Sequence, residues 1–112
     1  MRKIVEQMMI AIRNKENSWH QGNTSVHVDM DNDILVCLHG KQIASISDDH
    51  IEISCGGIDA TNIISSRLKP IVKEFTNYSI HRKGKFFVVT NGKKKYKLTK
   101  GDTMYLTRKD LK

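Results

Sequence analysis

Apolar residues near the start of the chain recur with the spacing of an α-helix. Between Arg2 and Arg13 they share one helical face, at the i, i+3 and i+4 positions occupied by Ile4, Val5, Met8, Met9 and Ile12. This spacing predicts an amphipathic helix. Residues 14–23 are polar and include Gly22, so we expect a connecting loop there.

After this loop the apolar period changes from helical to alternating. Residues 25–30 alternate polar and apolar side chains, which predicts a strand with one solvated face. Residues 34–38 are apolar at every position and predict a central, well-buried strand. Two more strands are predicted at 42–47 and 50–54. Turn-forming residues at 31–33, 39–41 and 48–49 separate the strands of this region. The pattern predicts an antiparallel meander of about four strands.

A second helix is expected after the break at residues 55–57. Asp59 or Thr61 can cap its first turn, because a side-chain oxygen there accepts a hydrogen bond from a free backbone N–H. Its buried stripe consists of Ile64, Leu68, Ile71, Val72 and Phe75. Pro70 lies inside this pattern and has no N–H, so we expect it to bend the helix near residues 67–69 or to split it.

The last third of the chain predicts a second antiparallel meander, of three to four strands. The strands are expected at 78–82, 85–90, 94–99 and 103–107. Glycine-containing turns separate them, and Asn91-Gly92 is the strongest of these signals. Residues 86–89 are all apolar, which leaves open the face of this strand that is buried. The prediction is one α+β domain over residues 1–112.

The net charge is concentrated in the same last third. Residues 1–75 hold eight Lys and Arg against ten Asp and Glu, and residues 76–112 hold eleven against two, so the two parts carry −2 and +9 of the total +7. No apolar run approaches the ~20 residues needed to span a bilayer, and we expect no membrane insertion. Cys37 and Cys55 lie far apart and predict free, mostly buried thiols, with a disulfide or a reactive thiol as the alternative.

The basic residues of this region form a candidate binding surface: Arg82, Lys83, Lys85, Lys93, Lys94, Lys95, Lys97 and Lys100. If the strands pair as predicted, seven or eight cations share one side and one end of the sheet, and Tyr96 and Leu98 point to the face opposite Lys95 and Lys97. Like charges packed so closely repel one another unless an anion offsets them. The surface therefore predicts binding to nucleic acid or to an acidic protein. A solvated lysine surface that protects a sheet edge is the alternative.

Lysine dominates this surface over arginine, which favours contacts with backbone phosphates over readout of bases. Binding to nucleic acid should then be weakly sequence-specific and strongly salt-dependent. An exposed aromatic among the lysines would suit single strands, and Tyr96 is included in the candidate site among Tyr78, Phe86, Phe87, Tyr96 and Tyr105. Trp19, in the polar loop, either folds back over the first helix or anchors a protein partner.

Residues that could support catalysis or metal binding are scattered. The histidines lack the spacing of metal ligands: His20, His27, His39, His50 and His81. Two pairs could act as acid and base, although exposed strand positions are the simpler interpretation: His27 with Asp29, and His50 with Glu52. The acidic run 29–33 begins like a calcium loop but lacks its later Gly and Glu. We expect no metal, no cofactor and no enzymatic activity, with a ribonuclease-like reaction as the alternative.

Three short motifs stand out between residues 34 and 106: His39-Gly40-Lys41-Gln42-Ile43-Ala44, Cys55-Gly56 and Ser66-Arg67-Leu68. They resemble an uncharacterised family of small tailed-phage proteins. The chain departs from the pattern of that family at Lys41, where Asn is usual, at Gly57, where Trp is usual, and at Lys69-Pro70, where Asn-Ala is usual. The resemblance implies a phage-encoded accessory protein that acts in the host cytoplasm, and it carries over no site residues.

The leading hypothesis is an accessory protein whose lysine-rich C-terminal sheet binds nucleic acid, RNA slightly ahead of DNA, with low sequence specificity. The alternative is an inhibitor that binds a host or anti-phage defence protein through the same surface. The sequence leaves the oligomeric state open, a homodimer included.

Overall fold

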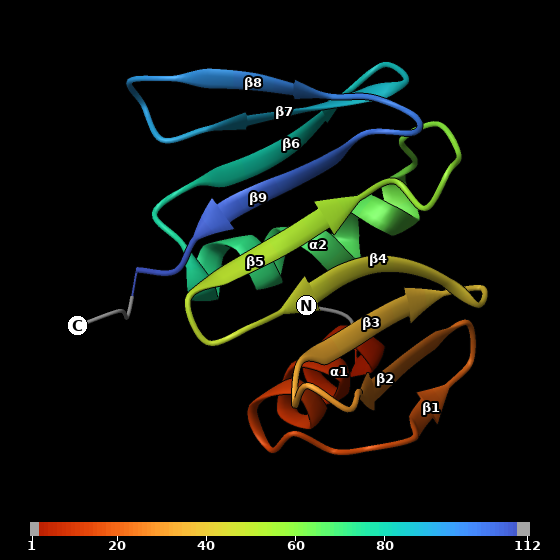
Figure 1. The fold of residues 1–112 in the computed structure, drawn as a ribbon. Coiled ribbons are helices and arrows are strands. Elements are labelled where there is room, and N and C mark those ends of the chain that lie inside the picture. Colours follow the sequence, from red (N-terminus) through yellow and green to blue (C-terminus); the bar gives the residue numbers. More distant parts are fainter. Residues whose placement is uncertain (1–2, 110–112) are drawn as a thin grey trace.

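The computed structural model describes residues 3–109, which form two helices and two antiparallel sheets (Figure 1). The helices are α1 (Lys3–Arg13) and α2 (Asn62–Phe75). The strands are β1 (Trp19–Gln21), β2 (Thr24–Val28), β3 (Ile34–Leu38), β4 (Lys41–Ile46), β5 (His50–Ser54), β6 (Ser79–Lys83), β7 (Phe86–Thr90), β8 (Lys95–Leu98) and β9 (Thr103–Thr107). The predicted α+β class is confirmed, and residue 2, where the first helix was expected to begin, lies outside the described residues.

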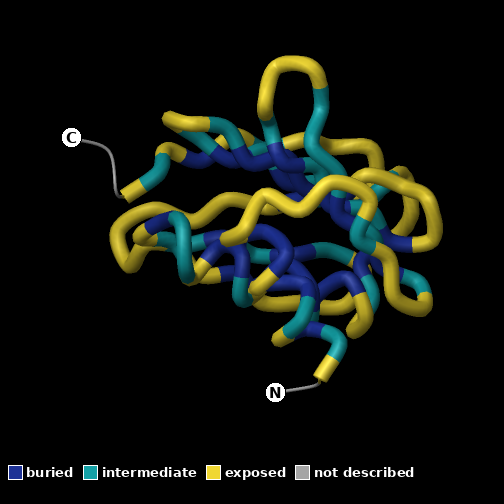
Figure 2. The backbone as a smooth tube through the Cα atoms, turned by 90° about the horizontal axis from the view of Figure 1, so that it is seen from below, coloured by how far each residue is buried: buried dark blue, intermediate teal, exposed yellow. Residues whose placement is uncertain are grey.

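Both helices cover the same face of a six-stranded sheet, whose order is β1-β2-β3-β4-β5-β9 (Figures 1 and 2). The predicted apolar stripe of α1 is buried through Met8 and Ile12, and that of α2 through Leu68 and Ile71. They meet the inward side chains of the strands in one core, which Figure 2 shows as the dark interior segments. Burial of this apolar area is the main force that holds the helices on the sheet.

The second sheet has three strands, in the order β6-β7-β8. Phe87 and Val89 of its central strand are fully buried and join the same core as α2. The alternation of a strand therefore turns Phe86 and Val88 outward, which answers the question that the apolar run left open.

The fourth strand expected in the second meander belongs to the first sheet instead. β9 crosses back and pairs with β5, with Leu106 opposite Ile51 in the buried core. Its alternating pattern predicted a strand but could not say which sheet it joins, because pairing partners far apart in sequence leave no local signal.

The expectation of a loop over residues 14–23 is wrong for its second half. β1 forms there and pairs with β2, with Trp19 opposite Val26. Trp19 is half-buried against the core. Three residues are too few to show a period, and this is why the pattern missed the strand.

Helix α2 is held by a cap at its start and by core packing around Pro70. Thr61 is its N-cap, and the Thr61 Oγ1 accepts a hydrogen bond from the backbone N of Ile64 at 3.2 Å. The helix runs unbroken through Pro70, so of the two predicted alternatives, a bend or a split, the structure excludes the split. Leu68 and Ile71 are fully buried on either side of Pro70, and their packing holds the helix together despite the missing hydrogen bond.

Strand β3 is buried on one face only. Ile34, Val36 and Leu38 point into the core, whereas Leu35 and Cys37 are half-buried on the face that neither helix covers. The continuous apolar run predicted a strand buried on both faces, and this chain buries one of them.

Candidate nucleic-acid interface

The outward face of the three-stranded sheet carries lysines from two of its strands. In the strand register, Lys83 lies opposite Phe86, Lys97 opposite Val88 and Lys95 opposite Thr90. Directly paired residues of antiparallel strands point to the same face. Since Phe86 and Val88 point outward, these side chains share one solvent-facing surface, here called the basic face: His81, Lys83, Phe86, Val88, Thr90, Lys95 and Lys97.

Phe86 is held beneath a lysine at the end of this face that adjoins the β6–β7 turn. The Nζ of Lys97 lies 4.3 Å from the centroid of the Phe86 ring. An ammonium over an aromatic ring is attracted by the ring's negative face, by about 0.5–1 kcal/mol at exposed sites. The face thus combines a half-buried aromatic ring with a cation that can move away from it.

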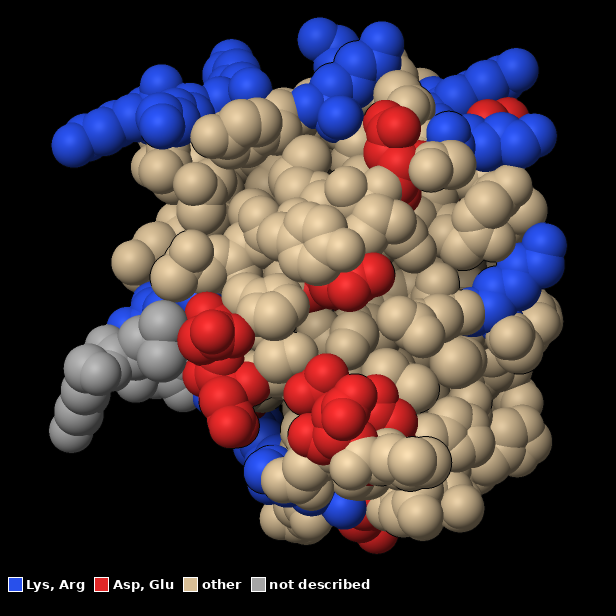
Figure 3. Space-filling model, viewed as in Figure 1, with Lys and Arg blue, Asp and Glu red and all other residues tan. Residues whose placement is uncertain are grey.

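The lysines lie in two groups at opposite ends of the sheet, so the expectation that they share one end is wrong. Lys83, the last residue of β6, and Lys85 lie at the β6–β7 turn, and the β7–β8 turn, at the other end of β7, holds Lys93 and Lys94. Lys100 follows β8, whose last residue pairs beside the β6–β7 turn. Figure 3 shows the resulting separate groups of basic side chains along one edge of the molecule. Consecutive turns of a meander lie at opposite ends of its sheet, and this separates the lysines of the two turns.

The β7–β8 turn is built to present its lysines. The Asn91 Oδ1 accepts hydrogen bonds from the backbone N of Lys93 at 3.0 Å and of Lys94 at 2.9 Å. Gly92 has φ of +91°, a conformation that a residue with a Cβ adopts only under strain. The Asn-Gly turn predicted from the sequence is confirmed, and it fixes the backbone from which both lysines project.

Two predicted site residues in strands β6 and β8 point away from the basic face. Arg82 pairs with the buried Phe87 and so points to the other side, where its Nη1 donates to the carbonyl oxygen of Gly84 at 3.1 Å. Tyr96 pairs with Val89, and its ring lies 6.3 Å from that of Tyr78, centroid to centroid. Phe86 is the aromatic that the structure places among the lysines, together with His81 from the neighbouring strand. Because residues 86–89 are all apolar, their pattern could not predict which of these side chains point outward.

The charges of the basic face are not offset by ion pairs. Among the described residues, no lysine of this face forms an ion pair, and Asp102 lies in the turn that follows β8. Hydrogen bonds from the side chain and backbone N of Thr99 hold the pKa of Asp102 below its usual value. The lysine charges are therefore left to act on a partner.

The histidines and cysteines form no comparable site. The His50 Nδ1 lies 2.6 Å from the Asp49 Oδ1, and this hydrogen bond lowers the pKa of Asp49. Over residues 3–109 no three metal-ligating side chains gather. Both cysteines are free; burial raises the pKa of Cys37 and raises that of Cys55 to about 11.

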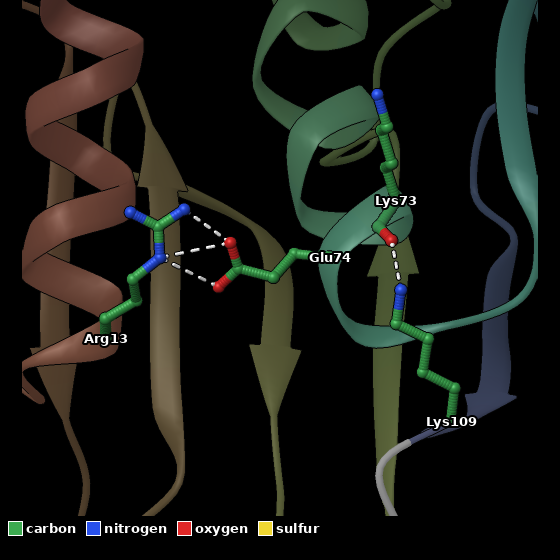
Figure 4. Close-up of polar contacts among 4 residues, drawn as sticks. All are labelled: Arg13, Lys73, Glu74 and Lys109. Carbon is green, nitrogen blue, oxygen red and sulfur yellow. Dashed lines mark hydrogen bonds and ion pairs between the residues drawn. The ribbon is translucent and has the colours of Figure 1, made fainter.

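A groove of about 560 Å³ lies between the two helices, lined by Glu6, Met9, Ile10, Arg13, Pro70, Lys73, Glu74 and Lys109. Figure 4 shows its polar contacts: the Arg13 Nε donates to the Glu74 Oε1 at 3.0 Å, and the Lys109 Nζ donates to the Lys73 carbonyl oxygen at 3.1 Å. The hydrogen bond to Glu74 raises the pKa of Arg13. Charges of both signs line the groove, so it selects no class of ligand.

The fold and this surface define a class: a small two-sheet α+β protein with a lysine-bearing sheet face. The sequence matches the family described as Kyanoviridae Gp96 protein over residues 1–105, and the chain belongs to this family of phage proteins. Neither the curated proteins nor the solved structures gave a match to the chain. The phage setting that the short motifs implied is thereby confirmed, and the match begins well before them. No helix among the described residues is long and apolar enough to cross a membrane.

Proposed function

We propose that the basic face binds single-stranded nucleic acid, RNA in preference to DNA, in the cytoplasm of the phage's host. The observation that carries this proposal is the placement of Phe86 between lysines from both flanking strands. Unpaired lysines attract phosphates without regard to sequence. An aromatic ring on an open sheet face stacks unpaired bases, which a duplex keeps hidden.

The two groups of lysines set the path of the strand. β7 has five residues, so its ends are roughly 14 Å apart at ~3.4 Å per residue. A nucleic-acid backbone that runs along β8 meets cations at both ends and Lys97 in the middle. When Lys97 turns towards a phosphate, it uncovers the Phe86 ring for a base.

Charge reversal tests this proposal. Lys83→Glu, Lys95→Glu and Lys97→Glu combined should reduce affinity for a fluorescent single-stranded RNA by about 100-fold or more in an anisotropy titration. Wild-type affinity should fall about tenfold or more between about 50 and 200 mM salt. The control changes three exposed lysines elsewhere, Lys15→Glu, Lys41→Glu and Lys69→Glu, and thus makes the same change in net charge.

Two outcomes contradict the proposal. Equal losses in both triple variants would mean that total charge, not the basic face, attracts the RNA. Salt-insensitive binding would mean that phosphate contacts do not dominate. The inhibitor alternative gains support instead if the wild type, but not the basic-face variant, captures one host protein after nuclease treatment.

A further inference from the structure

Strand β3 is apolar on both faces, but this chain covers one. Strands with such continuous apolar sequences are usually buried on both sides of their sheet. Here the second side, which carries Leu35 and Cys37, belongs to the open face of the six-stranded sheet, opposite the helices (Figure 1). The sequence of β3 thus indicates that something covers the open face.

The middle of the open face is largely uncharged. One row crosses five strands in register, through His27, Leu35, Ser45, Glu52 and Tyr105. Tyr105 is 65% exposed, and tyrosine is enriched in the centres of protein interfaces. Glu52 is the carboxylate in this row, and a covering surface must supply it with a donor, as a histidine or a tyrosine hydroxyl can.

One end of the open face is acidic. The β2–β3 and β4–β5 turns are neighbours, because Ile34 pairs with Ile46, and they hold Asp29, Asp31, Asp33, Asp48 and Asp49. The Asp29 Oδ1 accepts from the backbone N of Asp31 and of Asp33, both at 2.9 Å, which fixes the first turn. Arg108 lies beside the second turn and donates to the carbonyl oxygen of Ser47 at 2.8 Å. Here these two turns are called the acidic end.

The edge opposite the acidic end is formed by the three-stranded sheet. It is basic, includes Lys93 and Lys94 of the β7–β8 turn, and is here called the basic edge. Figure 3 shows most lysine and arginine side chains along the edge formed by the three-stranded sheet, with a few acidic side chains among them. Most acidic side chains lie in the lower half, beside a few basic ones, and the surface between is mostly uncharged. A half-turn about a line through the middle of such a face brings the basic edge of one copy onto the acidic end of another, and the reverse. A face with this layout is complementary to itself. A partner with charges of only one sign would complement only half of this face.

We infer that the open face is the interface of a two-fold symmetric homodimer. Two salt-sensitive contacts between basic edge and acidic end flank a central contact made by Leu35 and Tyr105. The molecule measures 34 × 34 × 26 Å, so one broad face can supply the ~800 Å² per partner that a stable interface needs. This inference rests on the open face and does not depend on nucleic-acid binding, although Lys93 and Lys94 belong to both surfaces.

Sedimentation of nuclease-treated protein is the first test. At about 50 mM salt the wild type should sediment at twice the mass of the 12.8 kDa chain, and at about 500 mM salt it should dissociate at least in part, because screening weakens both flanking contacts. A wild type that stays monomeric at low salt and high concentration overturns the inference.

A pair of charge reversals makes the test specific to this geometry. Asp31→Lys with Asp48→Lys reverses two of the five carboxylates of the acidic end, and Lys93→Glu with Lys94→Glu reverses two lysines of the basic edge; all four side chains are exposed. Each variant alone should be monomeric. Mixed in equal amounts, the two should form a heterodimer, detected by co-purification through a tag on one of them. Variants that still dimerise alone, or a mixture that stays monomeric, contradict the proposed interface.

Discussion

The two sheets of this protein place their charges differently. In the six-stranded sheet the acidic residues gather in turns at one end, and the strands that cross its open face are mostly uncharged. In the three-stranded sheet the lysines stand on the strands as well as in the turns. The first arrangement leaves a broad face free for another surface, and the second aims charge along an extended anion.

The crossover strand sharpens this contrast. β9 lies in the basic last third of the sequence, yet its residues, Thr103–Thr107, include no charged side chain, and it joins the other sheet. Within the basic last third of the sequence, the lysines therefore lie on the three-stranded sheet, whereas the strand that joins the six-stranded sheet carries no charge.

The largest expected effect tests whether the three-stranded sheet packs as firmly into the core as the six-stranded sheet does. Phe87→Ala should lower the free energy of unfolding by about 3–5 kcal/mol, because it leaves a cavity where a fully buried ring packs. Urea unfolding measures this loss. Phe86→Ala is the matched control and should cost about 1 kcal/mol or less, since that ring lies on the outer face. Similar losses for both would mean that the two faces of β7 have been assigned wrongly.

A smaller effect tests the polar link between α2 and the six-stranded sheet. Arg67 is almost fully buried, and its Nε donates to the Thr24 Oγ1 at 2.9 Å. Thr24→Val keeps the shape but removes this acceptor, and should cost about 1–3 kcal/mol because a buried donor loses its partner. Thr24→Ser, which keeps the hydroxyl, should recover most of that loss. If valine unfolds no more easily than serine, this hydrogen bond does not hold the helix to the sheet.

The start of α2 should contribute less again. Thr61→Ala removes the cap on the N of Ile64 and should destabilise the protein by about 1 kcal/mol, as judged from its urea midpoint. Thr61→Asp restores an oxygen acceptor and should return stability to near the wild-type value. An alanine variant as stable as the wild type would show that water caps this end equally well.

The thiols should differ in reactivity without any change in stability. Burial raises the pKa of Cys55 to about 11, so at pH 8 about one molecule in a thousand carries its thiolate. Iodoacetamide should therefore label half-buried Cys37 first in the folded protein, and both thiols after denaturation, as mass spectrometry can record. Equal labelling in the folded state would place Cys55 closer to solvent than its environment indicates.

Local patterns predicted most of the elements but not their assembly. The helical stripe of α1, the cap of α2 and the Asn91-Gly92 turn each depend on neighbours in sequence. Each was predicted, the cap as either Asp59 or Thr61. The sheet that β9 joins, the outward direction of Phe86 and the separation of the lysines into two groups depend on pairing between distant residues. Strand β1 was not predicted for another reason: a run of three residues is too short to show a period.

The central claim is that the basic face holds nucleic acid, and the absorbance of protein purified without nuclease tests it most directly. The wild type is predicted to have a high ratio of absorbance at 260 nm to that at 280 nm, which falls after treatment with RNase. The variant with Lys83→Glu, Lys95→Glu and Lys97→Glu should have the low ratio of free protein from the start. A low ratio for the wild type, or a high ratio for the variant, would contradict the claim.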